Sequence, residues 1–255
     1  GIFTTLLFPP YFIYPLGFVI FTYICLYVEK NIQDSNFIKL FTHSFFFSFS
    51  FFGSLLFWMG NPFLIYEETS NLFILPIFFI FFIGILFSII FAVFIKYNKV
   101  VPIFFLVPLI FISFEIVISI LLYGFPWISF SLIISNQDHL LFNFKIFGTL
   151  ITSYIVIQLF CFPYLFLSKN YLKLKYYLIF IFPIFFVLIS QVNINDHNTN
   201  KDTVINVEIF QTNFQINDSN YENRLSYLIE NIKRSNADLI VFSENNYPYI
   251  IQNYK

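Results

Sequence analysis

The sequence predicts a multi-span α-helical membrane bundle followed by the start of an α/β domain. The first observation is composition: of 255 residues, 58% are hydrophobic and only 11% are charged. A soluble domain is about 45–50% apolar and about 25% charged. The second observation is a change of pattern near residue 190, where long apolar runs give way to a polar stretch and then to short segments with strand and helix periods.

Apolar runs before residue 190 define the predicted spans. A helix needs about 20 residues to cross the hydrocarbon core, and Pro9, Pro10 and Pro15 interrupt the first run. We expect residues 1–8 to be the remnant of a first span and the chain to be truncated at both ends, since its only methionine is Met59. Within a bundle covering residues 1–190, further spans are expected at residues 15–28, 40–59, 72–95, 101–122, 144–167 and 176–190.

Loop charges predict which side of the membrane each loop occupies. The loops 61–71 and 123–143 contain no lysine or arginine. The loop before each of them and the loop after each of them carry lysine, so lysine-bearing and lysine-free loops alternate along the chain. Under the positive-inside rule the lysine-bearing loops are cytoplasmic, so everything after residue 190 is expected on the outer side. Only Lys145, at the edge of a span, departs from the pattern. The loop lysines are Lys30, Lys39, Lys96, Lys99, Lys169, Lys173 and Lys175.

The polar part begins with a linker at residues 191–203, and residues 204–255 read as the beginning of an α/β domain. Alternation around Val207 and Ile209 predicts a strand. Helical spacing of apolar residues predicts an amphipathic helix over residues 219–235, and the apolar run 237–242 predicts a buried strand. Such a unit favours parallel strands, with Glu244 following the second strand, where sites of open α/β sheets form.

Few other side chains stand out as candidates for chemistry. Glu115 lies inside a predicted span, and intramembrane carboxylates usually face the bundle interior. Trp127 is either an interfacial anchor or part of a lipid entrance. Cys25 and Cys161 read as small hydrophobic residues, and the three histidines match no ligand pattern. We therefore expect no metal and no cofactor. A net charge of −1 argues against nucleic acid as a partner.

Four stretches resemble the apolipoprotein N-acyltransferase family. The most specific is Glu115, nine residues before a Gly-Phe-Pro-Trp run. Where that family usually has proline before the catalytic Glu and arginine three residues after the intramembrane Glu, this chain has Ser243 and Ile118. The matching stretches are Phe8-Pro9-Pro10 with Tyr14-Pro15, Phe52-Gly53-Ser54 with Trp58, Glu115 with Gly124-Phe125-Pro126-Trp127, and Phe210-Gln211 with Ala237 to Pro248.

The resemblance implies a bacterial inner-membrane enzyme with a nitrilase-like α-β-β-α sandwich on the periplasmic side. Its partners would be a phospholipid acyl donor and a lipoprotein acceptor. An acyl chain would pass through a Cys thioester to the terminal diacylglyceryl-Cys of the lipoprotein. Glu244 matches the general base of a Glu-Lys-Cys triad, and Glu115 and Trp127 match positions near the lipid. The catalytic Lys and Cys would lie beyond Lys255, so these 255 residues alone are expected to be inactive, and the chain to be a monomer.

Two other functions stay open from the sequence. One is a membrane-anchored nitrilase or amidase that hydrolyses small amides with the same chemistry. The other is a non-catalytic membrane protein, such as a scaffold or a transporter. A transporter is disfavoured because matching halves with interrupted spans are absent from the sequence. A downstream lysine at a strand end, followed by a cysteine at a strand-to-helix turn, would favour an enzyme.

Overall fold

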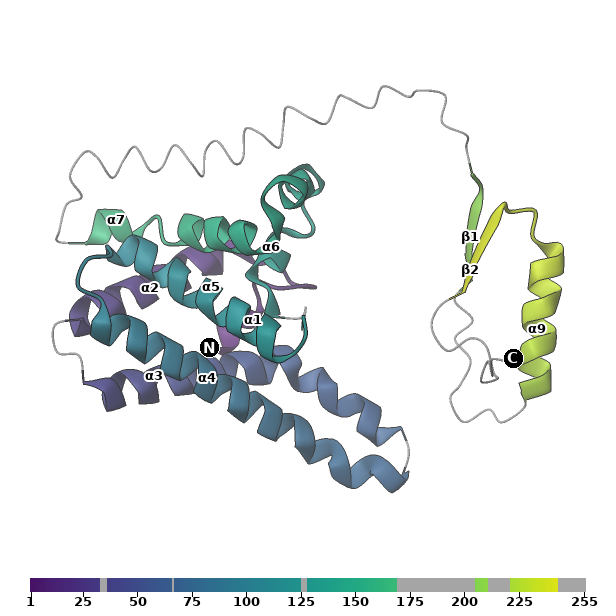
Figure 1. The fold of residues 1–255 in the computed structure, drawn as a ribbon, viewed down its shortest axis with the longest axis horizontal. Helices are drawn as coiled ribbons and strands as arrows, with labels where there is room; N and C mark the ends of the chain where they lie inside the picture. Colours follow the sequence, from purple (N-terminus) through teal and green to yellow (C-terminus); the bar gives the residue numbers. More distant parts are fainter. Residues whose placement is uncertain (33–35, 66, 125–127, 169–204, 211–220, 243–255) are drawn as a thin grey trace. The chain divides into compact units, whose positions relative to one another are not determined.

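The computed structural model describes residues 1–32, 36–65, 67–124, 128–168, 205–210 and 221–242 (Figure 1). The chain divides into two compact units, Gly1–Asp196 and His197–Lys255. In the described residues the first unit is helical, and the second contains two strands and one helix. This confirms the predicted fold class, a helical membrane bundle followed by the start of an α/β domain.

Seven α-helices are described in the first unit, together with three 3₁₀ segments, η1, η2 and η4. The helices are α1 (Ile2–Thr5), α2 (Tyr14–Asn31), α3 (Phe37–Leu56), α4 (Leu75–Tyr97), α5 (Ile103–Leu121), α6 (Asp138–Phe160) and α7 (Tyr164–Leu167). The 3₁₀ segments are η1 (Phe57–Leu64), η2 (Glu67–Ile74) and η4 (Phe130–Ile134).

Residues at the helix ends explain several of these boundaries. Pro15 opens α2 and Pro76 opens α4, positions where the missing N–H of proline costs nothing. Asn36 caps α3, since its side-chain oxygen accepts hydrogen bonds from the backbone N–H groups of Ile38 and Lys39 at 3.0 and 3.3 Å. Such a cap satisfies donors that have no partner inside the helix.

Four helical stretches of the described part are long and apolar enough to cross a membrane: Phe37–Leu64, Glu67–Tyr97, Ile103–Leu121 and Asp138–Leu167. Each overlaps a span that the sequence predicts. Helix α2 is not among them, because Glu29, Lys30 and Asn31 at its end lower its hydropathy. The predicted span at residues 176–190 and the linker at 191–203 lie outside the described residues.

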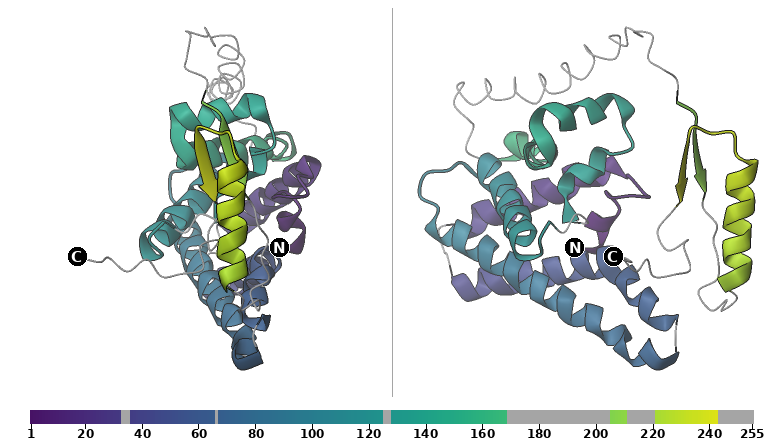
Figure 2. Two further views of the ribbon diagram at one scale, coloured as in Figure 1. Left: turned by 90° about the vertical axis from the view of Figure 1, so that its right-hand side faces the viewer. Right: turned by 45° about the vertical axis from the view of Figure 1, so that its right-hand side comes forward.

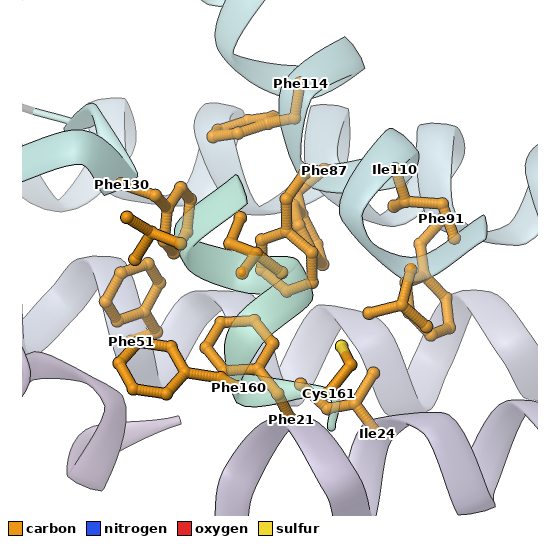
Figure 3. Close-up of a cluster of buried hydrophobic side chains, with 14 of the residues drawn as sticks. Phe21, Ile24, Phe51, Phe87, Phe91, Ile110, Phe114, Phe130, Phe160 and Cys161 are labelled. Atoms are coloured by element: carbon orange, nitrogen blue, oxygen red, sulfur yellow. The ribbon is translucent and has the colours of Figure 1, made fainter. Parts of the chain in front are cut away.

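Phenylalanine rings fill the centre of the bundle (Figure 3). Phe111 of α5 meets Phe130 edge-on, with ring centroids 5.0 Å apart. Phe21 of α2 stacks on Phe160 of α6 at 5.8 Å, and both geometries are favourable for aromatic pairs. The rings therefore join helices that are far apart in sequence into one core.

Small residues bring α3 and α4 together. The Ser48 hydroxyl of α3 donates a hydrogen bond to the Gly84 carbonyl of α4 at 3.1 Å, and the Ser88 hydroxyl bonds the same carbonyl at 2.6 Å. A Cβ atom at Gly84 would lie 3.4 Å from the Phe45 ring. Close contact through Gly and Ser is typical of helix pairs in membranes, where apolar burial alone does not drive association.

The second unit contains β1 (Val207–Phe210), α9 (Tyr221–Arg234) and β2 (Leu239–Phe242). The strands pair in parallel, with Val207 opposite Leu239 and Phe210 opposite Phe242. Figure 2 shows α9 beside the strand pair. This confirms the predicted strand-helix-strand unit and its parallel pairing.

Only one face of this small sheet is covered in the described residues. Phe210 and Phe242 stack at 5.5 Å on the half-buried face. The opposite face carries four exposed apolar side chains: Val207, Ile209, Leu239 and Val241. An exposed apolar face of this kind marks a surface that packs against another layer.

Candidate functional site

The chain leaves α5 through a left-handed turn at the end that the sequence predicts to be external. The Leu122 N–H bonds the Ile118 carbonyl at 2.9 Å, and the Gly124 N–H bonds the Ser119 carbonyl at 2.8 Å. Tyr123 has φ 50° and Gly124 has φ 90°. This is the Schellman pattern, which satisfies the last carbonyls of a helix and reverses the chain. It returns the following segment toward the bundle.

Glu115 holds that returning segment. Its Oε1 atom accepts a hydrogen bond from the Phe130 backbone N–H at 2.7 Å. Its Oε2 atom accepts bonds from the hydroxyls of Ser153 at 3.1 Å and Ser129 at 3.3 Å. The side chain is only 7% exposed, so it faces the interior as expected for an intramembrane carboxylate. The carboxylate joins α5, η4 and α6 through one node.

The serines around Glu115 also hydrogen-bond to one another and to the backbone. The Ser131 backbone N–H donates to the Ser153 hydroxyl oxygen at 2.8 Å, and the Ser129 and Ser131 hydroxyls lie 2.7 Å apart. Non-helical backbone at membrane depth is tolerated only where its polar groups find partners inside the protein. Glu115 and Ser153 provide those partners for the start of η4.

The segment around η4 differs from the sequence-based expectation. Residues 123–143 were predicted as an outer loop, whereas Ile128, Phe130 and Ile133 are buried in the core. Phe130 is 0% exposed and contacts the rings of Phe8, Phe51 and Phe111. The reason is that this apolar stretch is too short to cross a membrane but long enough to fill the centre of the bundle.

A cavity of about 360 Å³ adjoins the carboxylate. Glu115, Ser129 and Ser131 contribute polar atoms to its wall, and Ile118, Leu132 and Phe144 contribute apolar ones. A pocket that is largely apolar with a few converging polar groups is typical of ligand sites. The cavity can therefore take a molecule with a polar group on a hydrocarbon chain.

Helix α6 is broken beside this cavity. Gly148 has φ 68° and ψ −178°, a conformation essentially restricted to glycine. The predicted span 144–167 is thus a helix in two parts, and α7 follows at Tyr164–Leu167. Phe144 before the break and Thr149 after it both line the cavity. Helix α6 contacts both η4 and the neighbouring helices α2 and α5.

The other predicted site residues, Trp127 and Glu244, lie outside the described residues. The structure does describe the strand that leads to Glu244, since β2 ends at Phe242, two residues earlier. The register aligns Phe210 with Phe242, so both strands end at the same edge. Asp238 fixes the opposite edge, where its carboxylate accepts a hydrogen bond from the Asn206 N–H at 2.9 Å.

Neither cysteine belongs to a site of the described residues. Cys25 and Cys161 are free and buried in the apolar core. Within the described parts of the chain, no three His, Cys, Asp or Glu side chains come together as metal ligands.

Sequence reasoning missed Ser129, Ser131 and Ser153. Serine is common in transmembrane helices and alone indicates no site. The available signal was the alternation of Ser129 and Ser131 within an apolar stretch, 14 and 16 residues after an intramembrane carboxylate.

Together, the apolar helices and the buried carboxylate node define a multi-pass helical membrane protein with an attached α/β unit. A family model described as the apolipoprotein N-acyltransferase N-terminal domain matches residues 1–162. The chain belongs to the apolipoprotein N-acyltransferase family.

A curated apolipoprotein N-acyltransferase from Rickettsia bellii (strain RML369-C) is 27% identical over 256 residues, covering 96% of this chain. The match covers 50% of that relative, so the chain spans about half its length. No solved structure gives a significant match.

Proposed function

We propose that the chain forms the membrane part and the beginning of the catalytic domain of an apolipoprotein N-acyltransferase in the bacterial inner membrane. The observation that supports this most is the parallel pairing of β1 with β2. Their carboxyl ends share one edge, and sites in open α/β sheets form at that edge. The family motif segments beginning at Gln211 and Ser243 follow these two strands directly.

Glu244 is the general base in this proposal. It takes the proton of a cysteine thiol, and the thiolate attacks the ester carbonyl of a phospholipid. A thioester forms, the ester C–O bond breaks, and Glu244 returns the proton to the oxygen of the leaving lysophospholipid. The amino group of the lipoprotein's terminal diacylglyceryl-Cys then attacks the thioester, which forms an amide and restores the thiol. Cys25 and Cys161 are not this nucleophile, because both are buried among apolar side chains of the bundle.

A nitrilase-like sandwich also fits the second unit. Such a sandwich buries one face of each sheet against a second sheet and covers the other face with helices. In the described residues, Val207, Ile209, Leu239 and Val241 form an exposed apolar face. On the other side, the Ser235 hydroxyl at the end of α9 bonds the Glu208 carboxylate of β1. This arrangement supports assignment of residues 204–255 to the start of an α-β-β-α domain.

Glu115 and Trp127 have a positioning role in this proposal. The Glu115 cavity adjoins the end of α5 that the loop charges assign to the outer side, and its wall combines hydroxyls with apolar side chains. Such a wall suits the ester region and the upper acyl chain of a phospholipid. Trp127 follows Gly124 by three residues, a position consistent with a role at the cavity entrance.

The test uses the complete reading frame that contains this chain, reconstituted with a phospholipid carrying a labelled acyl chain. We expect a labelled thioacyl enzyme and transfer of the label to a diacylglyceryl lipopeptide. Glu244→Gln should abolish both. Glu230→Gln, which removes an exposed carboxylate paired with Arg234 on α9, is the matched control and should keep both.

Three results would count against the proposal. One is an undiminished thioacyl enzyme in Glu244→Gln, which would remove Glu244 from the role of base. Another is hydrolysis of small amides without lipid transfer, which would favour the amidase alternative. The third is acyl transfer by these 255 residues alone, which would contradict the expectation that the triad is incomplete in them.

A further inference from the structure

One wall of the Glu115 cavity comes from the first half of α6, residues 138–147. Phe144 is the lining residue from this half. The rest of the wall comes from α5, from the segment that returns from Gly124 to η4, and from Thr149 and Leu150 after the break. Moving the first half of α6 away from α5 would therefore open the cavity by displacing one aromatic ring, and the polar wall would stay in place.

The backbone at the break is not held by packing. Gly148 has φ 68° and ψ −178°, and a Cβ atom added to it would meet nothing within 4 Å. Thr149 and Leu150, the next two residues, are exposed. The hinges of moving elements are a few residues at element ends that absorb the change in φ and ψ. Gly148 can therefore serve as a pivot for residues 138–147.

The other end of this half is tied to α2 by hydrogen bonds near the surface. The Tyr14 hydroxyl donates to the Asn136 side-chain oxygen. The Gln137 side-chain N–H donates to the Tyr14 hydroxyl oxygen at 3.4 Å. Hydrogen bonds between neutral side chains add little net stability where water can replace them. They can act as a latch that holds this half of α6 in place and releases it at low cost.

A buried amide inside this half is left without partners. Asn143 is 0% exposed, and neither its Oδ1 atom nor its Nδ2 atom has a hydrogen-bond partner among the described residues. Nearly all buried polar groups in native proteins are hydrogen-bonded. The predicted span begins at residue 144, so Asn143 is expected at the depth of the outer headgroups, where water and ester groups are available. The observed position of the helix therefore carries a penalty that an outward movement removes.

From these features we propose that residues 138–147 form a lid over the Glu115 cavity. The lid pivots at Gly148 and is latched by Tyr14. When it opens, an acyl chain enters the cavity sideways from the outer leaflet, past the exposed apolar side chains of Ile146 and Leu150. When it closes, the Phe144 ring separates that chain from the bilayer. The inference rests on the proposed function, because it concerns the cavity that positions the phospholipid.

Distances between two spin labels on the complete reading frame, held in lipid nanodiscs, test the movement without any reaction. One label is attached to the lid at Lys145→Cys and the other to α5 at Ile120→Cys, both exposed positions. Accessible cysteines elsewhere are first replaced by serine. We expect two distances, one for the closed lid and one for the open lid. The matched control moves the lid label across the break to Ile151→Cys, also exposed, and should give a single distance.

Two substitutions should shift the balance in opposite directions. Tyr14→Phe removes the latch hydroxyl and should raise the ratio of open to closed lid about fivefold, the effect of losing one weak hydrogen bond. Asn143→Leu replaces the unbonded amide with an apolar group of similar size and should lower that ratio about fivefold. Tyr23→Phe, at an exposed position of the same helix α2, is the control and should leave the ratio unchanged.

A single distance between Lys145→Cys and Ile120→Cys, or the same two distances from Ile151→Cys, would overturn the proposal. So would a ratio that Tyr14→Phe and Asn143→Leu leave unchanged. These distances are recorded without substrate, so they test the lid even if no acyl transfer is observed. Where transfer is observed, Asn143→Leu should lower kcat/KM for the phospholipid about fivefold. An unchanged kcat/KM would overturn entry of the lipid under the lid.

Discussion

At the scale of single residues, Glu115 is the side chain on which most of the site geometry depends. One carboxylate accepts hydrogen bonds from a backbone N–H and two serine hydroxyls. Without the carboxylate, the Phe130 N–H would be buried with no acceptor among the described residues. Leaving a buried polar group unbonded costs about 1–3 kcal/mol, so the node stabilises the bundle by satisfying groups that water cannot reach.

Glu115→Ala should therefore lower the free energy of unfolding by about 1–3 kcal/mol, because it leaves the Phe130 N–H buried and unbonded. Glu115→Gln is the matched variant. Its amide oxygen can still accept from Phe130, and the serine hydroxyls can rotate to accept from its NH₂ group. A clearly smaller loss is expected for it.

Unfolding midpoints of the purified chain in detergent measure both changes. Equal losses for Glu115→Ala and Glu115→Gln would contradict this explanation, since they would show that charge rather than hydrogen-bond acceptance stabilises η4.

The sequence predicted that Glu115 faces inward, because charge inside a bilayer is costly. It did not predict the partners. Ser129 and Ser131 come from a loop that folds back, and Ser153 comes from another helix, so their meeting depends on tertiary packing. Trp127 and Glu244 remain predictions carried by motif spacing.

At the scale of elements, α6 is broken at Gly148, next to residues that line the cavity. The Thr152 hydroxyl donates to the Gly148 carbonyl at 2.7 Å, a bond that helical threonines commonly make to the carbonyl four residues earlier. The periodic apolar pattern of residues 144–167 predicts a continuous helix, because a single glycine is compatible with one. The sequence therefore predicted the helix over residues 144–167 but not its break at Gly148.

Gly148→Ala should destabilise the bundle by about 1–3 kcal/mol, the cost of placing a side chain in this backbone region. Nothing lies within 4 Å of the added Cβ atom, so the cost comes from the backbone and not from a clash.

Gly53→Ala in α3 is the control. Its added Cβ atom would meet Ile80 at 4.0 Å in ordinary contact, and alanine favours the helix by about 0.5–1 kcal/mol. Thermal unfolding of the two variants should move in opposite directions. A Gly148→Ala variant as stable as Gly53→Ala would show that α6 can straighten without loss.

Segment η4 shows a second limit of pattern reading. A hydropathy profile identifies a membrane span by the length of its apolar run. The apolar stretch before residue 135 is far shorter than the roughly 20 residues that a span requires. A short apolar run between a left-handed turn and a helix start can lie outside or fold inward. Here the segment folds inward, because the Glu115 carboxylate accepts a hydrogen bond from the Phe130 N–H and the Phe130 ring is buried in the core.

At the scale of the whole molecule, the proposed function requires the α/β unit that follows the helical bundle to lie on the outer side of the membrane. The fold class could be predicted because composition and period are properties of long segments, which single tertiary contacts do not change. Sidedness rests on the alternation of lysine-bearing loops. The lipoprotein acceptor and the phospholipid donor of the proposed reaction both depend on that sidedness.

The measurement that tests this claim most directly is cysteine labelling in intact cells whose outer membrane has been permeabilised. A membrane-impermeant maleimide is applied to Lys233→Cys, an exposed position on α9. Lys99→Cys, exposed in a lysine-bearing loop, serves as the internal reference. Native Cys25 and Cys161 are buried and form the background. We predict labelling of Lys233→Cys in intact cells and of Lys99→Cys only after the inner membrane is opened. The reverse pattern would place residues 204–255 in the cytosol and contradict the account.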